Sequence, residues 1–200
     1  MSVLVVLLLM IIGINEFMIR ILDILFSLIG LLFGLPVLII ITVFGFFDSG
    51  SPFFRQERVG RNMKPFSLIK FRTMYINTSS VATHLVNSSS ITPLGNFLRK
   101  RKLDELPQLW NVLKGDMSLV GPRPSLFNQK DVIKARFLLD VYSVRPGITG
   151  LSVINNIVMD TPKLLAQTDA KMIVSLSVAK YFEYIFLTVK GKGQGDRVLR

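Results

Sequence analysis

Apolar positions dominate the first part of the chain. No charged side chain occurs from Ile24 to Phe47, and as a helix this run would measure about 36 Å, enough to cross a hydrocarbon core of about 30 Å. Pro36 lies in the middle of the run, where its ring removes one backbone donor and clashes with the preceding turn. The pattern therefore predicts a helix that is kinked or broken near residues 32–35.

Two membrane topologies are compatible with this run. A kinked helix would span the bilayer, whereas a helix–break–helix hairpin would enter and leave through one face. The pattern alone slightly favours the spanning helix. Residues 1–14 are also apolar, but they lack the basic start and the cleavage site of a signal peptide, and as a helix they are only about 21 Å long. They predict an interfacial or partly inserted segment that is retained.

Beyond residue 50 the pattern changes to shorter elements. Residues 53–74 alternate apolar and basic side chains around Gly60, which predicts short strands or a hairpin. Thr92 and Pro93 are typical of a helix start, and a second helix is expected from Asp104 to Lys114, ended by Gly115. We therefore expect an α/β fold, rich in helix with short strands.

A last helix is expected over residues 179–189, and it carries an aromatic stripe. Such a stripe belongs to the core by default, although a helix lying in a membrane interface would use the same residue types. The stripe consists of Tyr181, Phe182, Tyr184, Ile185 and Phe186.

Charge is distributed unevenly along the chain. The 200 residues carry a net charge of +11, yet residues 1–50 hold one basic and three acidic side chains, so the excess of cations lies in residues 51–200. The absence of cysteine excludes disulfide scaffolds, thiolate zinc sites and cysteine nucleophiles. Six cations follow the apolar run, and the positive-inside rule places them in the cytoplasm, against an anionic leaflet. They are Arg55, Arg58, Arg61, Lys64, Lys70 and Arg72.

The densest candidate site is a run of four cations, residues 99–102, that leads into Asp104 and Glu105. Clustered cations at a helix start are a ready phosphate site, and a carboxylate held there can attack phosphorus or hold a metal ion. Acidic residues are also common at helix starts, and a basic run is often a solvated flank. On spacing alone that simpler interpretation would hold more often.

Two further segments present an arginine on a rigid backbone. Pro122 and Pro124 flank Arg123, and rigid presentation suits bidentate phosphate recognition. Arg145 precedes a Pro-Gly turn, with Gly150 available for close backbone approach. Each segment could equally be a structural turn with an exposed arginine. No dinucleotide fingerprint, P-loop or HExxH motif occurs.

Together these segments resemble the bacterial sugar transferase family, the monotopic phosphoglycosyl transferases that start lipid-linked glycan assembly. The resemblance covers roughly residues 18–150, and its most specific part is residues 103–124, LDELPQLWNVLKGDMSLVGPRP. The other matching stretches are residues 51–60, 70–74 and 144–150.

The resemblance implies transfer of sugar-1-phosphate from a UDP-sugar to undecaprenyl phosphate, with release of UMP, through a covalent phosphosugar–aspartyl intermediate. It implies that Asp104 is the nucleophile and that Glu105, together with Asp104, holds Mg²⁺. It further implies phosphate or substrate contacts for a set of polar side chains. These are Arg99, Arg123, Arg145, Lys70 and Thr149.

The resemblance also reverses the topology preference, since family members have a proline-broken helix that re-enters the cytoplasmic face of the bacterial inner membrane. Pro36 lies where that proline belongs, whereas Leu35 stands where many members have serine. We thus expect an apolar segment at 1–17, a re-entrant helix–break–helix at 18–50 and a compact cytoplasmic catalytic domain at 51–200. The segment after Gly150 departs from the family pattern, so the resemblance does not identify which sugar is the substrate.

Two other functions compete with this prediction. One is a catalytically inactive, membrane-docked module that binds anionic lipids or assembly partners. The other is nucleic-acid binding, which the basic charge supports only weakly because no nucleic-acid motif is present. We expect no nucleic-acid partner. The oligomeric state is open, with a homodimer as one option.

Overall fold

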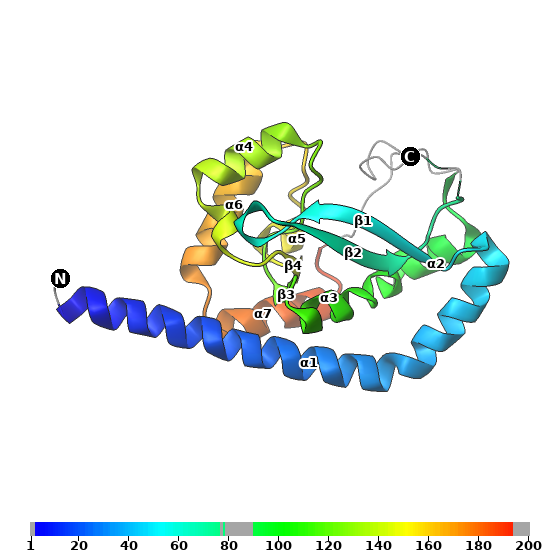
Figure 1. The fold of residues 1–200 in the computed structure, drawn as a ribbon, viewed down its shortest axis with the longest axis horizontal. Coiled ribbons are helices and arrows are strands. Elements are labelled where there is room, and N and C mark those ends of the chain that lie inside the picture. The colour runs from blue at the N-terminus through cyan, green and yellow to red at the C-terminus, as the bar shows by residue number, and fades with distance from the viewer. Residues whose placement is uncertain (1–2, 77, 79–89, 194–200) are drawn as a thin grey trace.

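The fold is helix-rich with short strands, as predicted (Figure 1). The computed structural model describes residues 3–76, 78 and 90–193, and for residues 3–12 it describes the backbone only. The helices are α1 (Val3–Ser49), α2 (Pro93–Lys100), α3 (Gln108–Lys114), α4 (Lys130–Leu138), α5 (Leu151–Ile154), α6 (Pro162–Ser175) and α7 (Val178–Val189), with 3-10 turns η1 (Arg61–Met63), η4 (Leu103–Glu105) and η5 (Val141–Ser143). The strands are β1 (Phe53–Val59), β2 (Pro65–Phe71), β3 (Ser118–Val120) and β4 (Gly147–Thr149).

Helix α1 runs along one face of the molecule and bends toward its C-terminal end (Figure 1), and Pro36 lies inside this helix. The helix continues through Pro36, so the kink is present without a break in the helix. Proline removes only one bond of the helical ladder. Packing of both halves on the same domain, through Ile19 and through Ile41, holds the helix together on either side of it.

Most of α1 faces outward. One narrow stripe at helical spacing is buried against the domain, and it includes Ile19, Asp23, Ser27 and Ile41. Of the described residues, only Gly13–Ser49 form a helix long and apolar enough to cross a membrane, and 11% of its most apolar stretch is buried. A core helix of a soluble protein would be mostly buried, so the exposed apolar surface indicates association with a membrane.

The first two strands form the predicted hairpin. Strands β1 and β2 pair antiparallel, from Phe53 opposite Phe71 to Val59 opposite Pro65, and η1 forms the connection. The rings of Phe53 and Phe71 stack with centroids 5.2 Å apart. The alternation of apolar and basic residues therefore places one face of the hairpin toward the domain.

The other two strands are parallel and very close at one end. Ser118 pairs with Gly147 and Val120 with Thr149. A Cβ atom on Gly147 would lie 2.0 Å from the backbone nitrogen of Gly121, so only glycine allows this approach. The contact joins the segment that carries Arg123 to the segment that carries Arg145, although the two are far apart in sequence.

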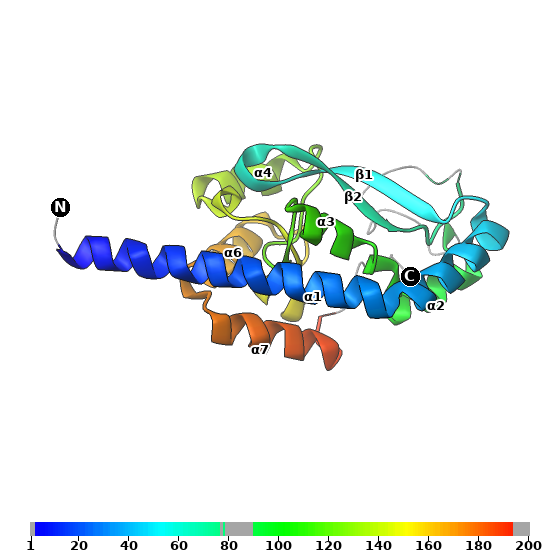
Figure 2. The same cartoon turned by 60° about the horizontal axis from the view of Figure 1, so that its bottom comes forward.

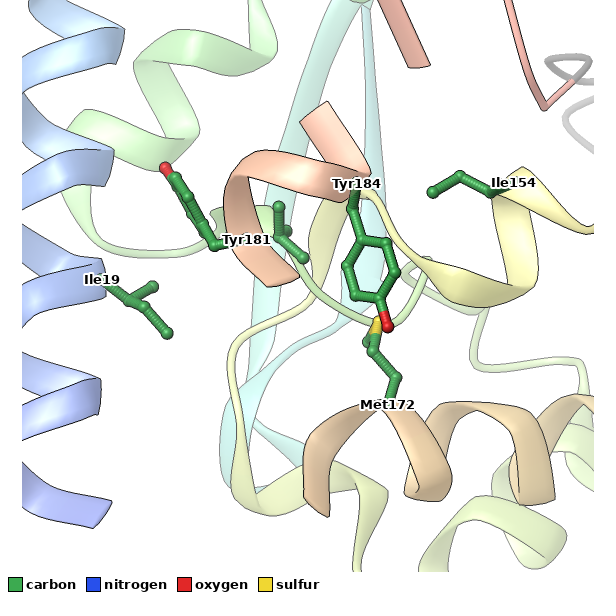
Figure 3. Close-up of a cluster of buried hydrophobic side chains, with 6 residues drawn as sticks. Ile19, Ile154, Met172, Tyr181 and Tyr184 are labelled. Atoms are coloured by element: carbon green, nitrogen blue, oxygen red, sulfur yellow. The ribbon is translucent and has the colours of Figure 1, made fainter. Parts of the chain in front are cut away.

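The main apolar cluster joins α1 to the C-terminal helices. It contains Ile19, Val120, Ile154, Met172, Tyr181 and Tyr184 (Figure 3). Figure 3 shows the Tyr181 ring between α7 and α1, and its hydroxyl donates a 3.0 Å hydrogen bond to Asp23. Burial, and secondly the Asp23 carboxylate, raise the pKa of Tyr181, so the phenol remains a donor.

The aromatic stripe of α7 is divided between the core and the protein surface. Tyr181 and Tyr184 are buried, whereas Phe182 and Phe186 are exposed. Phe182 meets Phe26 of α1 edge-on at 5.9 Å, and Figure 2 shows α7 lying alongside α1. The outer rings of α7 thus extend the exposed apolar surface of α1.

One helix was predicted with the wrong start. Thr92 caps α2 as expected, since its hydroxyl accepts from the backbone N–H of Gly95 at 3.0 Å. The helix expected from Asp104, however, is a single 3-10 turn followed by α3, which begins only at Gln108. Pro107 has no N–H to donate, so the helical ladder resumes after it. Gly115 ends α3 with φ 100°, as predicted.

Candidate active site

A small pocket lies beside Glu105, among β1, β2, η4 and the segments that flank the parallel strands. It combines three cations with one carboxylate and a few apolar groups, and we call it the Glu105 pocket. Its lining consists of Arg58, Leu68, Lys70, Glu105, Gln108, Arg123, Pro124, Gly147 and Ile148. A pocket with an excess of cations suits an anionic ligand.

An ion pair crosses this pocket. The Nη2 atom of Arg123 lies 3.4 Å from Oε1 of Glu105, and both side chains are mostly buried. The pair joins η4 to the Pro122–Pro124 segment, whose prolines restrict the backbone on either side of the arginine. The guanidinium is therefore held at the pocket wall with little freedom.

Asp104 lies in the same 3-10 turn as Glu105. It is 9% exposed and is not among the lining residues of the Glu105 pocket. The turn begins at Lys102, which takes the left-handed conformation with φ 56°. This turn, rather than the first turn of an α-helix, holds the adjacent carboxylates.

A buried ion pair supports the Arg123 segment from behind. Arg136 of α4 donates from Nε and Nη2 to Oδ2 of Asp169 at 3.0 and 2.7 Å, and from Nη1 to the carbonyl of Arg123 at 2.7 Å. Both side chains are almost fully buried. Burial raises the pKa of Asp169, and the Arg136 guanidinium opposes that shift. One side chain thus ties α4, α6 and the backbone of Arg123 together.

The structure brings some of the predicted site residues together and not others. Lys70, Glu105 and Arg123 line the Glu105 pocket. Arg99 lies in the last turn of α2 and does not line it, and the hydroxyl of Thr149 pairs with that of Thr188 on α7. The Arg145 side chain lines a different pocket beside α1. The substrate contacts predicted for these three residues stay predictions.

Sequence reasoning did not assign Arg58 and Gln108 to the site, and it included Lys102 only as a member of the basic run 99–102. Arg58 and Gln108 line the pocket, and Arg58 donates to the carbonyl of Pro124 at 3.0 Å. Lys102 lies close enough to Glu105 and Arg123 to interact with both. Burial lowers the pKa of the Lys102 ammonium, the Glu105 carboxylate opposes this shift, and Arg123 adds to it. The strand alternation and the basic run were the available signals, but they do not identify a pocket.

Asp104 and Glu105 are the residues at this site that could hold a metal ion. Among the residues that the structure describes, no group of three or more His, Cys, Asp or Glu side chains could hold a metal. Mg²⁺ needs no such group, because it keeps several waters and is commonly held by one or two carboxylates together with substrate phosphates. The adjacent carboxylates of Asp104 and Glu105 provide such a pair.

Comparison with known proteins identifies the family to which this arrangement belongs. The sequence model of the family described as bacterial sugar transferase matches residues 14–193. The chain belongs to the bacterial sugar transferase family. The match includes both carboxylates, the Pro-Arg-Pro segment and all of the helices from α2 to α7.

Individual relatives carry names that differ in the sugar. A Klebsiella pneumoniae UDP-glucose:undecaprenyl-phosphate glucose-1-phosphate transferase is 38% identical over 189 residues, covering 88% of this chain and 40% of that protein. A Salmonella typhimurium undecaprenyl-phosphate galactose phosphotransferase is 38% identical over 157 residues, 68% of this chain and 32% of its own. A putative undecaprenyl-phosphate N-acetylgalactosaminyl 1-phosphate transferase of Bacillus subtilis is 42% identical over 133 residues, 65% and 70% respectively. The chain thus spans less than half the length of two of these three relatives.

Proposed function

We propose that this protein is a sugar-1-phosphate transferase that moves the phosphosugar of a UDP-sugar to undecaprenyl phosphate and releases UMP. The observation that carries the proposal is the Glu105 pocket, where the Glu105–Arg123 ion pair lies with two further cations, Arg58 and Lys70. Asp104 does not line this pocket but neighbours Glu105 in the same 3-10 turn. Both substrates are phosphate anions, so a pocket with surplus cations attracts them. Family membership and the functions for which the relatives are named support the same reaction. The sugar is open.

The proposed chemistry has two displacements at one phosphorus atom. A carboxylate oxygen of Asp104 attacks the sugar-side phosphorus of the UDP-sugar, and the phosphoanhydride bond to UMP breaks, with the electron pair leaving on UMP. An oxygen of undecaprenyl phosphate then attacks the same phosphorus and displaces the Asp104 carboxylate. The product is undecaprenyl diphosphosugar, and the free carboxylate is regenerated. Arg123 stabilises the negative charge that develops on the phosphoryl oxygens.

We assign the Mg²⁺ of the family to Asp104 and Glu105. When bound, the ion would neutralise phosphate charge and so favour departure of UMP. Lys70 and Arg123 orient the phosphates from the pocket walls, and Arg58 fixes the Pro124 carbonyl and hence the direction of the Arg123 segment. Chelation of divalent cations should therefore stop turnover without unfolding the protein.

The test uses the purified full chain and a panel of UDP-sugars without lipid acceptor. One UDP-sugar should release about one UMP per protein, and the peptide containing Asp104 should gain the mass of a phosphosugar. Asp104→Asn should lower turnover with lipid acceptor by at least about 10³-fold, since it removes the nucleophile. Asp131→Asn, at an exposed position of α4, is the matched control and should match the unmodified protein. Normal turnover by Asp104→Asn would overturn the assignment.

We also propose that α1 re-enters the cytoplasmic face of the bacterial inner membrane. The support is that both halves of the helix contact the same domain. Before the bend, Asp23 accepts hydrogen bonds from Ser118 and from the backbone N–H of Leu119. After it, Ile41 packs in one cluster with Phe71 and Leu98. A helix that spanned the bilayer would carry one of its ends away from a domain that lies on one side.

A further inference from the structure

A second pocket lies beside the N-terminal half of α1. Three arginines from three segments of the chain reach it, and we call it the arginine pocket. Arg20 comes from α1, Arg61 from η1, and Arg145 from the segment before β4. Apolar groups complete the wall, among them Ile19 and Leu176. None of the three arginines lines the Glu105 pocket, so the two pockets are distinct.

Two of the arginines are anchored by backbone carbonyls. Arg20 donates from Nη1 to Val112 at 2.7 Å and from Nη2 to Leu113 at 3.0 Å, and so satisfies carbonyls at the end of α3. Arg145 donates from Nε to the carbonyl of Gly115 at 3.0 Å. These bonds fix both guanidinium groups in place. They leave the positive charges unneutralised, because a carbonyl carries no net charge.

Carboxylates compensate this charge only in part. Glu16 lies 3.8 Å from Arg61 and is half exposed. Asp23 also lines the pocket, but its Oδ1 atom already accepts hydrogen bonds from Ser118, Leu119 and Tyr181. Burial, and then the charges of Arg20 and Arg61, lower the pKa of Arg145, whereas the carboxylates of Asp23 and Glu16 raise it, which indicates like charges that are close together and compensated in part. The Nε of Arg61 is buried with no hydrogen-bond partner in the part of the chain that the structure describes.

We propose that the arginine pocket binds the phosphate of an anionic phospholipid headgroup. Planar guanidinium groups match phosphate geometry, and an anion here would relieve the repulsion among three cations. The position of the pocket along α1 also suits a lipid headgroup, since Arg20 lies one helical turn before the uncharged run that starts at Ile24. Headgroup phosphates lie at such a boundary between charged and apolar segments. The bound lipid would sit against α1 and Pro122, whereas the Glu105 pocket is lined by Arg123 and Pro124.

The test is native mass spectrometry of the full chain in neutral detergent, titrated with phosphatidylglycerol. Arg61→Gln should weaken binding of the first lipid about tenfold, because one charge-assisted contact is lost. Arg55→Gln removes the same charge from an exposed position of β1 and should change binding less than about twofold. Arg61→Gln does not touch the anchors of Arg20 and Arg145.

A second variant acts in the opposite direction. Glu16→Gln should strengthen lipid binding several-fold, because it removes the exposed carboxylate that competes for Arg61; Glu57→Gln on β1 is its control. This variant keeps the test decisive if Arg61→Gln does not fold. Equal effects of Arg61→Gln and Arg55→Gln would overturn the proposal, as general charge attraction would then suffice. Displacement of the lipid by equimolar inorganic phosphate would overturn the lipid assignment, since the ligand would then be a soluble phosphate.

Discussion

At the scale of single residues, Arg123 shows how local backbone chemistry and long-range contacts combine. Flanking prolines restrict its backbone, Glu105 pairs with its guanidinium, and Arg136 donates to its carbonyl at 2.7 Å. The side chain is thus oriented from three directions. Its role depends on the planar, branched guanidinium as much as on its charge.

We therefore expect Arg123→Lys to lower kcat/KM for UMP release at least about tenfold, a loss of about 1.4 kcal/mol in transition-state stabilisation. Lysine keeps the charge but cannot make two parallel bonds to a phosphate. Arg55→Lys, at an exposed position, should leave kcat/KM unchanged. Initial rates across UDP-sugar concentrations measure both values, and equal rates for the two variants would remove Arg123 from the proposed phosphate contacts.

Gly147 is important for the stability of the fold, because its backbone lies very close to that of Gly121. A methyl group there would meet the backbone of Gly121, which cannot move aside without separating β3 from β4. Gly147→Ala should lower the free energy of unfolding by about 1–3 kcal/mol, as expected for overpacking. Gly34→Ala is the matched control, since nothing lies within 4 Å of its added methyl. Thermal unfolding in detergent compares them, and an equal melting temperature would contradict the close approach.

At the scale of elements, α4 and α6 act on the site through one buried ion pair, and the chain offers an exposed pair of the same length for comparison. Arg136–Asp169 and Lys180–Glu183 both measure 2.7 Å, but the first pair is at most 1% exposed and the second is about 45% exposed. Burial decides what such a pair contributes, because an unpaired charge in the interior keeps no compensating water.

Arg136→Met should accordingly destabilise the fold by about 3–5 kcal/mol, since it leaves Asp169 buried without its partner. Lys180→Met should leave the free energy of unfolding almost unchanged, because the exposed pair is screened by water. Denaturant unfolding measures both. Similar decreases in the free energy of unfolding of the two variants would show that the buried Arg136–Asp169 pair stabilises the fold no more than an exposed pair does.

The elements also show where sequence patterns succeed. The hairpin, the Thr92 cap and the Gly115 end depend on neighbouring residues, and all three were predicted. The start of the helix expected at Asp104 was wrong because the missing N–H of Pro107 outweighed the acidic first turn. The α7 stripe could not be divided between core and surface, because a helix has the same period whether its apolar face meets protein or lipid.

At the scale of the whole molecule, one helix carries both the membrane surface and part of the domain interface. Its outer side chains are exposed, with Phe33 77% and Phe47 86% accessible. Its buried stripe holds Asp23, which binds β3 immediately before the Pro122–Pro124 segment. Helix α1 therefore connects the exposed apolar surface to the strand that precedes Arg123.

This arrangement makes the re-entrant topology testable. The chain has no native cysteine, so Asn15→Cys and Ser51→Cys each introduce one label site, one on either side of the uncharged run. In intact cells neither should react with an impermeant maleimide, and in inverted vesicles both should. Reaction of the residue 15 site only from outside the cell would favour a helix that spans the bilayer.

The sequence by itself determined the family, the apolar helix, the hairpin and the adjacent carboxylates, because each depends on residue types at short, fixed spacing. Only the tertiary structure decided which arginines meet. Arg123 and Arg145 looked equivalent in the sequence, yet they line different pockets, although the parallel pairing of β3 with β4 brings their segments together at Gly121 and Gly147. Arg20 and Arg61 join Arg145 from distant positions in the sequence, because convergence depends on how elements pack, and no local pattern encodes it.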